Sequence, residues 1–206
     1  MIALLLAAAV LPNAVDAERA FAADAHKRGQ WTAFRATAHF GAVMFTPAPV
    51  YAQDFLTGRK DPPAAVQWWP SLSLQSCDGA SAVNHGPWLK GAGHGTFTTV
   101  WHRIGGEWKW TYDGGKISAG AAPAKRAPIV RRASCRRLPQ PTDQWTPAPL
   151  PSPDSTFAGS GQSGMSRNQS LKWAWTIDRQ NRRHFAAELW NGRRFEPAFN
   201  ETVSGE

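Results

Sequence analysis

The chain has 206 residues, which is enough for one domain with a sizeable hydrophobic core and an additional segment. Lys and Arg number 23 and Asp and Glu number 15, so the formal net charge is +8. The eleven tryptophans exclude a disordered chain for the segments that carry them, because Trp buries a large area in a core, a pocket or an interface.

Residues 1–17, MIALLLAAAVLPNAVDA, are typical of a secretory signal peptide. The apolar run Ile2 to Leu11 is too short to span a bilayer as a helix. Val15 and Ala17 are small residues in the positions that precede a cleavage site at Glu18. This pattern predicts an exported and periplasmic protein. A core helix that the mature protein retains is the alternative.

The first part of the chain is predicted to be helical. Residues 18–40 are rich in Ala and carry apolar side chains every three or four positions, with Gly29 as the expected break between two helices. Residues 42–45 form a short apolar strand that ends at the prolines that follow. Two short helices are expected next, over residues 50–58 and over residues 64–69 after the helix start Asp61-Pro62-Pro63.

Four strands in succession are predicted to form an antiparallel meander. They are residues 71–76, 82–90, 96–104 and 106–115. The third, TFTTVWHRI, is the clearest, because it is rich in β-branched and aromatic residues. Gly105-Gly106 is expected to form the hairpin turn between the third and fourth strands.

The fourth strand, GEWKWTYDGG at residues 106–115, carries an aromatic residue at every second position. Strict alternation would place Trp108, Trp110 and Tyr112 on one face of the sheet. Asp113 would lie on the opposite face, and we expect its carboxylate to close a turn at the two glycines that follow. The alternative is a carboxylate in an apolar pocket, with a raised pKa and a role in proton transfer.

Residues 117–165 are predicted to be a linker. Its basic segment, residues 125–137, holds six Lys and Arg and no acid, and the following stretch is rich in Pro, Ser and Gly. A solvated surface is the expected role of the basic segment, with weak contact to anionic envelope components as an alternative. No nucleic acid partner is expected for an exported protein.

The C-terminal region, residues 166–206, is predicted to form a β-hairpin or a three-stranded meander. Its strands are residues 171–177, 184–190 and 193–199, and Asn191-Gly192 is a hairpin turn. An isolated hairpin is only marginally stable, so this region should pack on the main domain or on a second copy.

The two cysteines, Cys77 and Cys135, could form a disulfide in an exported protein, with two buried or free thiols as the alternative. Two cysteines alone do not make a zinc site, and no pair of histidines has the spacing of metal ligands. We therefore expect no metal ion and no cofactor.

The order of elements over residues 17–116 resembles the nuclear-transport-factor-2-like superfamily, which includes the SnoaL-like and ketosteroid-isomerase-like proteins. The resemblance is to secreted bacterial members of unknown function, and five segments carry it: AERAFA at 17–22 with WTAF at 31–34, AVMFTP at 42–47, and WHR at 101–103 with the strand 106–115. In this superfamily the turn before the first strand is often acidic. Here it contains His39-Phe40-Gly41, so no acid stands there.

The resemblance implies an α+β fold in which a strongly curved antiparallel sheet wraps around N-terminal helices as a cone, with a pocket at the wide end. The C-terminal β-hairpin would be an appendage. The predicted organisation is therefore a signal peptide at 1–17, the cone domain at 18–116, a linker at 117–165 and the β appendage at 166–206. Members of the superfamily often pair through the sheet, so a homodimer is also expected.

An aromatic-lined pocket is the predicted site of an exported small-ligand-binding protein. The candidate ligand-binding residues are Trp69, Trp88, Trp101, Trp108, Trp110 and Tyr112. An isomerase or lyase of the ketosteroid-isomerase or polyketide-cyclase type is an alternative, with Asp113, His85 or His39 as its catalytic base. A structural or dimerisation module is a further alternative. A lone His is more often structural or solvated than catalytic, and the fold alone does not choose among these functions.

Overall fold

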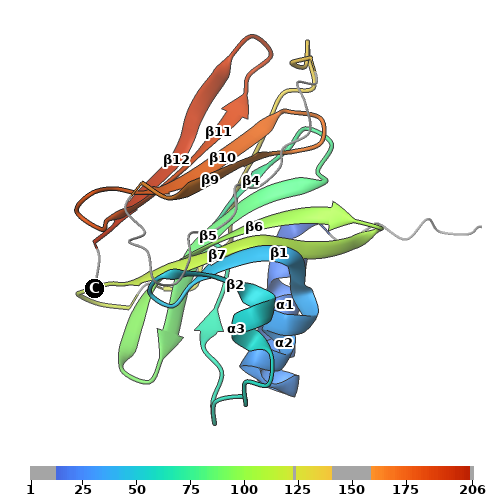
Figure 1. Cartoon of the computed structure of the whole chain (residues 1–206). Helices are drawn as coiled ribbons and strands as arrows, with labels where there is room; N and C mark the ends of the chain where they lie inside the picture. Colours follow the sequence, from blue (N-terminus) through green and yellow to red (C-terminus); the bar gives the residue numbers. More distant parts are fainter. Residues whose placement is uncertain (1–12, 123, 141–158, 205–206) are drawn as a thin grey trace, which may run out of the picture.

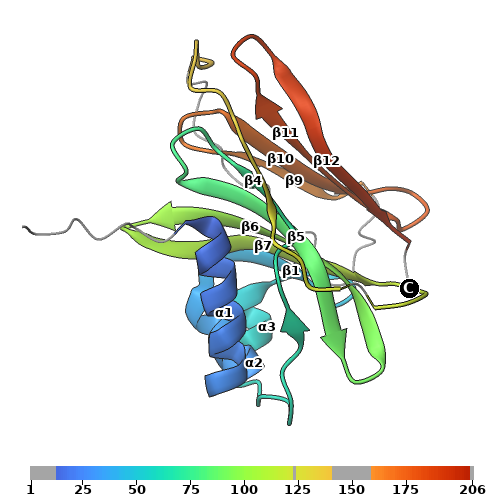
Figure 2. The same ribbon diagram turned by 180° about the vertical axis from the view of Figure 1, so that it is seen from behind.

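The computed structural model describes residues 13–122, 124–140 and 159–204. These residues form three layers: a helical layer, an eight-stranded sheet and a four-stranded sheet (Figures 1 and 2). The predicted α+β class, with a curved and mostly antiparallel sheet against N-terminal helices, is confirmed. Within the described residues, none of the helices has the length and apolar character needed to cross a membrane.

The helical layer consists of α1 (Ala14–Arg28), α2 (Gln30–Thr37) and α3 (Ala52–Leu56). Gly29 separates α1 from α2, as predicted, with a φ of 112°. A Cβ at this position would lie 2.2 Å from the carboxyl carbon of Asp61. That carboxylate accepts hydrogen bonds from the backbone N–H and the hydroxyl of Thr32. Asp61 therefore packs closely against Gly29 at the break between the two helices.

Helix α1 begins upstream of the predicted cleavage site at Glu18. Asn13 caps the helix in a capping box with Asp16, and the side chains of Ala14 and Val15 are buried in the core. Cleavage before Glu18 would remove this cap and the first turn. The predicted boundary at residue 17 therefore conflicts with the fold, in which these residues belong to the domain.

The eight-stranded main sheet has the order β2-β1-β7-β6-β5-β4-β8, with β3 paired to β5 beside β4. Its strands are β1 (Ala38–Phe45), β2 (Pro49–Tyr51), β3 (Gln67–Trp68), β4 (Leu72–Gln75), β5 (Ser81–Lys90), β6 (Gly93–Ile104), β7 (Glu107–Ile117) and β8 (Ile129–Arg132). The pairs β1–β7 and β4–β8 are parallel, and the other pairs are antiparallel. The edge strand β8 comes from the basic segment that was expected to be a linker.

The helix predicted for residues 64–69 is wrong. Gln67 and Trp68 form the short strand β3, in which Trp68 pairs with Trp88 of β5. Trp68 packs edge-on against Phe21 of α1 at a ring distance of 5.0 Å. These tertiary contacts override the local helix signal of the two prolines. The short helix expected within residues 50–58 is present as α3.

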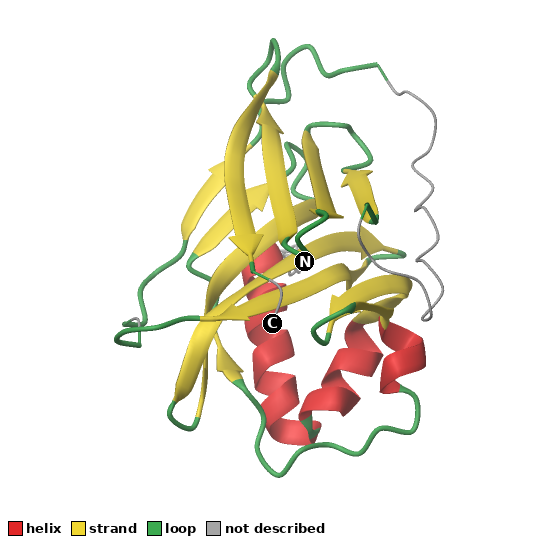
Figure 3. Cartoon of the chain, turned by 60° about the vertical axis from the view of Figure 1, so that its left-hand side comes forward, coloured by secondary structure: helices red, strands yellow, loops and turns green. Residues whose placement is uncertain are grey.

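The C-terminal sheet covers the face of the main sheet that points away from the helices, here called the outer face (Figure 3). Its four antiparallel strands follow one another in chain order as β9 (Gly161–Met165), β10 (Leu171–Ile177), β11 (Arg183–Trp190) and β12 (Phe195–Val203). This confirms a C-terminal β appendage, with one strand more than a three-stranded meander. Alternate residues of β10 and β11 are buried against the outer face.

A disulfide joins Cys77, after β4, to Cys135, after β8, with a Cα–Cα distance of 5.1 Å. It closes a loop of 58 residues and fixes the chain at the point where it leaves the main sheet for the C-terminal sheet. Of the alternatives for the two cysteines, the structure contains the disulfide.

Two hydrophobic cores result from this arrangement. The inner face, which contacts the helices, buries Trp101 and Trp110 with Phe21 and Phe34. The outer face buries a second group against the C-terminal sheet, which includes Val43, Leu74, Val83, Val100, Tyr112, Leu171, Trp173, Trp175 and Phe185.

A β-bulge in β7 corrects the predicted alternation of its aromatic residues. Trp110 pairs with Trp101, but Tyr112 pairs with Val100, so Thr111 is an extra residue opposite β6. Tyr112 therefore lies on the outer face, opposite to Trp110, and Asp113 is brought to the inner face. The turn expected at Asp113 is also wrong, because β7 continues to Ile117.

We predict that the outer core contributes strongly to stability. Phe185, which is 2% exposed and lies 4.8 Å from the ring of Tyr112, is the test position. Phe185→Ala should lower the free energy of unfolding by about 3–5 kcal/mol, because it removes an aromatic ring from a closed core. Urea unfolding measures this loss. Phe40→Ala is the control, since Phe40 is 82% exposed. Equal effects of the two substitutions would show that the C-terminal sheet is not packed as described.

Candidate functional site

Polar side chains cross the inner face of the main sheet in a single row. Asn84 of β5 lies opposite Thr99 of β6, and Thr99 lies opposite Asp113 of β7. The Thr99 hydroxyl donates a hydrogen bond to Asp113 Oδ2 at 3.2 Å. The bulge at Thr111 creates this row, because without it Asp113 would face the outer core.

Glu18 of α1 packs onto this row with no exposed surface. Its carboxylate accepts hydrogen bonds from the indole N–H of Trp101 at 2.6 Å and of Trp68 at 2.8 Å, and from the Asn84 amide at 3.2 Å. Three N–H donors from three strands therefore hold one carboxyl group of the helix. Asn84 also donates to the backbone oxygen of Ala14, so the same amide binds α1 at two places.

Burial raises the pKa of Glu18 from its ordinary value of 4.5 to about 7. The hydrogen bonds from Trp101, Trp68 and Asn84 oppose this rise, and the charge of Asp113 adds to it. Burial likewise raises the pKa of Asp113 to about 6, against the effects of the Thr99 hydrogen bond and the Arg183 charge. The inner core thus contains two neighbouring carboxyl groups, Glu18 and Asp113, whose pKa values are both raised.

Glu18 was missed by the sequence analysis, which placed it at the start of the mature chain. A signal was present, because Glu18 shares a helix face with residues three, four and seven positions away. Ala14, Phe21, Ala22 and Ala25 occupy these positions, and all four are buried. A charged residue within such an apolar stripe indicates a buried carboxylate with specific partners.

The six aromatic residues predicted to line a pocket are separated by the structure. Trp101 and Trp110 are fully buried beneath the helices, and Trp108 packs half-buried at the edge of the same core. Tyr112 lies in the outer core, and Trp69 is half-buried between β3 and β4. Trp88 is the member of this set that lines the cavity described below.

The histidine candidates lie away from the Glu18 carboxyl. His85 is on the outer face, where its ring is 3.0 Å from the Thr98 hydroxyl and stacks at 4.6 Å on Phe199. Burial and the nearby Lys116 lower the pKa of His85 to about 4. His39 accepts a hydrogen bond from the Gly41 N–H, and burial and Lys109 lower its pKa. Both rings are therefore neutral at pH 7.

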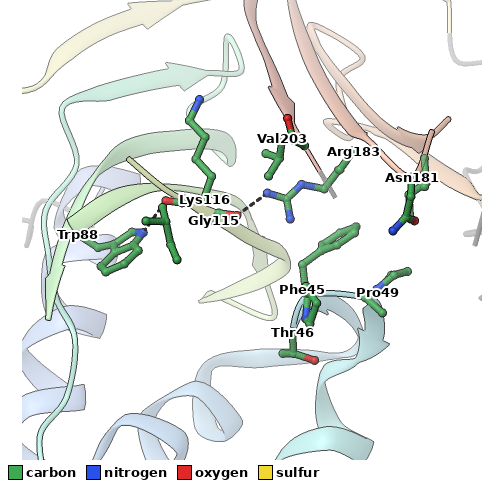
Figure 4. Close-up of a pocket in the computed structure, with 14 residues that line it drawn as sticks. Phe45, Thr46, Pro49, Trp88, Gly115, Lys116, Asn181, Arg183 and Val203 are labelled. Atoms are coloured by element: carbon green, nitrogen blue, oxygen red, sulfur yellow. Dashed lines mark hydrogen bonds between the residues drawn. The ribbon is translucent and has the colours of Figure 1, made fainter. Parts of the chain in front are cut away.

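A cavity of about 390 Å³ lies where the main sheet meets the C-terminal sheet (Figure 4). We call it the inter-sheet cavity. The β1–β2 loop, the end of β7, the start of β11 and the end of β12 form its walls. The lining residues are Phe45, Thr46, Pro47, Ala48, Pro49, Trp88, Gly115, Lys116, Ile117, Ile177, Asn181, Arg183, Val203 and Ser204. Apolar side chains predominate, and sequence reasoning missed most of this set.

Arg183 of β11 extends into this region and is only 6% exposed (Figure 4). Its Nη2 donates to the backbone oxygen of Gly115 at 2.7 Å, and its guanidinium carbon lies 4.3 Å from the centre of the Phe45 ring. A Cβ at Gly114 would come within 2.9 Å of Nη1, so the guanidinium depends on a glycine to lie close to β7.

Lys116 and Trp88 form the other side of the inter-sheet cavity. The Trp88 indole N–H donates to the backbone oxygens of Thr96 and Lys116, which fixes the ring against β6 and β7. The Lys116 ammonium lies 3.6 Å from the Glu201 carboxylate of β12. This pair therefore connects the two sheets beside the cavity.

Among the residues that the structure describes, no three His, Cys, Asp or Glu side chains gather in a way that could hold a metal ion. The carboxyl groups of Glu18 and Asp113 accept hydrogen bonds from N–H and hydroxyl donors instead.

We predict that Glu18 destabilises the folded protein as the pH rises, whereas the buried His85 and His102, whose pKa values are lowered to about 4, stabilise it as the pH rises to about 6.5. The pKa of Glu18 is higher in the folded state, so between pH 4.5 and about 7 the folded protein holds a proton that the unfolded chain releases. The full destabilisation, about 3 kcal/mol, is reached above pH 7. Asp113 also destabilises the folded protein as the pH rises, but this effect is complete at about pH 6.

The test is the free energy of unfolding measured by urea titration from pH 5 to pH 8. Relative to the wild type, Glu18→Gln should become progressively more stable as the pH rises from 5 to 7.5, since glutamine carries no charge at any of these pH values while the histidines are common to both proteins. Glu107→Gln is the control, because Glu107 is exposed and pairs only with Lys109 at the surface. An unchanged pH slope in Glu18→Gln would contradict the assignment.

No protein-family model and no curated protein matches this chain. The solved structures similar to it include a nuclear-transport-factor-2-like protein of unknown function from Shewanella oneidensis. The match covers 48% of this chain and 93% of that one, with 17% sequence identity and a TM-score of 0.40. A DUF3225-family protein of unknown function from Pectobacterium atrosepticum is 10% identical over 51% and 88%, also with a TM-score of 0.40. A candidate ketosteroid isomerase from Kribbella flavida is 17% identical over 57% and 94%, with a TM-score of 0.34. Each of these matches covers about half of this chain.

Proposed function

We propose that this protein binds a small, largely apolar molecule in the inter-sheet cavity. The observation that supports this most directly is the cavity itself, whose volume of about 390 Å³ falls within the range of pockets for small organic ligands. Phe45, Trp88 and Ile177 supply apolar walls, and a few polar groups stand among them. A pocket of this composition favours a ligand with an aromatic or aliphatic body.

The proposed pocket differs in place from the one expected at the wide end of the cone. The tryptophans beneath the helices fill that space as a core, since Trp101 and Trp110 have no exposed surface. The inter-sheet cavity lies instead between the main sheet and the C-terminal sheet. Both sheets are therefore needed to build the site.

We also propose that the protein is exported to an oxidising compartment such as the periplasm. The Cys77–Cys135 disulfide supports this, because such bonds persist mainly outside the reducing cytosol. If a signal peptide is removed, we expect the cut to fall at or before Asn13, so that the capping box of α1 is kept. N-terminal sequencing of protein from a periplasmic extract tests this, and a mature chain that starts at Glu18 would refute it.

Proton transfer by an isomerase or lyase is a second candidate function. It is favoured by the neighbouring carboxyl groups of Glu18 and Asp113, whose pKa values are raised to about 7 and 6. Ligand binding ranks first, because neither carboxyl group is among the residues that line the inter-sheet cavity. Turnover of a ketone or ester by the wild type that is lost in Asp113→Asn would favour the enzyme.

The proposed partners, a second copy of the chain and anionic envelope components, would bind outside the inter-sheet cavity. A homodimer would have to use a surface other than the outer face, because the C-terminal sheet of the same chain covers it. Weak contact with anionic envelope components would involve the edge strand β8, where Ile129, Val130 and two arginines are exposed. Both remain proposals.

Filling the cavity should abolish ligand binding without unfolding the protein. Ala48, in the β1–β2 loop, lines the cavity, so the phenyl ring of Ala48→Phe should occupy the space of a ligand. Ala36→Phe is the matched control, since Ala36 is exposed on α2 and is not a lining residue. Tryptophan fluorescence with a panel of small aromatic acids, amides and alcohols measures binding. If no compound binds to the wild type, or if Ala48→Phe binds as well as Ala36→Phe, the proposed function is wrong.

A further inference from the structure

We propose that the molecule in the inter-sheet cavity carries a carboxylate that pairs with Arg183. This inference rests on the proposed function, because it names the chemical class of the ligand. The observation behind it is a buried positive charge for which the described residues supply no ion pair. Arg183 is 6% exposed, and no carboxylate of a described residue lies within 4.0 Å of its guanidinium.

An unpaired guanidinium in such a place is costly, because its charge has left water without gaining a counter-ion. One of its five N–H groups donates to the Gly115 oxygen, and its face rests on the Phe45 ring. The Nε atom is buried and has no hydrogen-bond partner in the described structure. The side chain therefore retains a donor, Nε, that the described residues do not satisfy.

Three acids of the described residues that could serve Arg183 are engaged elsewhere. Asp178, at the start of the β10–β11 turn, pairs with Arg182 at 2.8 Å and with His184 at 2.9 Å. Glu201 pairs with Lys116. Asp113 does not pair with Arg183 either. Its Oδ2 accepts a hydrogen bond from Thr99 on the inner face, on the other side of β7.

The position of Arg183 makes an anionic ligand the natural partner. Its side chain lines the inter-sheet cavity together with Lys116, while the lining set contains no Asp or Glu. Figure 4 shows Arg183 pointing toward Gly115, with the Phe45 ring beside the guanidinium and Lys116 beyond Gly115 on the other side of the cavity. The described lining thus carries two cations and no acid.

A carboxylate with an apolar body fits these walls. A guanidinium presents parallel N–H groups that match the two oxygens of a carboxylate. Phe45, Trp88 and Ile177 would contact the apolar part of the molecule. A single negative charge suits a cavity in which one of the two cations, Lys116, is already shared with Glu201.

The test compares two probes that differ only in charge, 4-phenylbutyrate and its neutral analogue 4-phenylbutyramide. Isothermal titration calorimetry should show that the wild type binds the carboxylate at least ten-fold more tightly than the amide, as a charge-assisted pair predicts. In Arg183→Met the two affinities should become equal through loss of carboxylate binding, while the affinity for the amide stays unchanged.

Arg182→Met is the matched control. Arg182 is the adjacent residue, is exposed, and pairs with Asp178 outside the lining of the cavity. This variant should keep the wild-type preference for the carboxylate. Should circular dichroism show that Arg183→Met is unfolded, Arg183→Lys replaces it, and its carboxylate affinity should fall several-fold because the forked donor is lost.

The outcomes separate this inference from the proposed function. If both probes bind the wild type equally, or if Arg183→Met or Arg183→Lys binds the carboxylate as the wild type does, the role of Arg183 is overturned while ligand binding stands. If neither probe binds the wild type, the proposed function fails and the inference fails with it.

Discussion

The main sheet is buried on both faces, and most of the other features of the molecule depend on this constraint. Helices cover the inner face and the C-terminal sheet covers the outer face. The central strands must therefore supply core residues in both directions, and a simple alternation of apolar and polar residues is not possible there. The bulge at Thr111 is how β7 meets this demand, because it assigns Trp110 to one core and Tyr112 to the other.

Burial on both faces also explains where the polar groups lie. Glu18 and Asp113 occupy the inner core, in which each polar atom must find a donor or acceptor within the protein. The indole N–H groups of Trp68 and Trp101 do this for Glu18 while their rings fill the core. The high tryptophan content thus serves two purposes, since one side chain provides both apolar area and a hydrogen-bond donor.

Much of the fold was predictable from local patterns. The two helices around Gly29, the strand over residues 96–104 and the Asn191-Gly192 turn each follow from the spacing of apolar residues and glycines. The helix predicted over residues 64–69 failed because β3 forms through pairing with β5, a contact distant in sequence. The bulge at Thr111 could not be predicted either, since GEWKWTYDGG alternates without interruption and only the register with β6 reveals the extra residue.

The candidate site was less accessible than the fold. Trp88 was identified by its aromatic character, but Arg183 lies in a polar stretch with two other arginines, Arg179 and Arg182. The alternation of β11 places Arg183 on the same face as Phe185, Ala187 and Leu189, but its closure within the cavity depends on how the two sheets pack. Glu18 was detectable in principle from its helix face, but the adjacent small residues supported a cleavage site instead.

The position of the inter-sheet cavity has a kinetic consequence. Its walls come from β1, β7, β11 and the last residues of β12, so they are complete only after the C-terminal sheet has docked. A molecule held there contacts both sheets and would leave when they part locally. Its residence time would then be set by the rate of this local opening, and the Cys77–Cys135 bond, which anchors the chain between the sheets, would slow the escape as well as stabilise the fold.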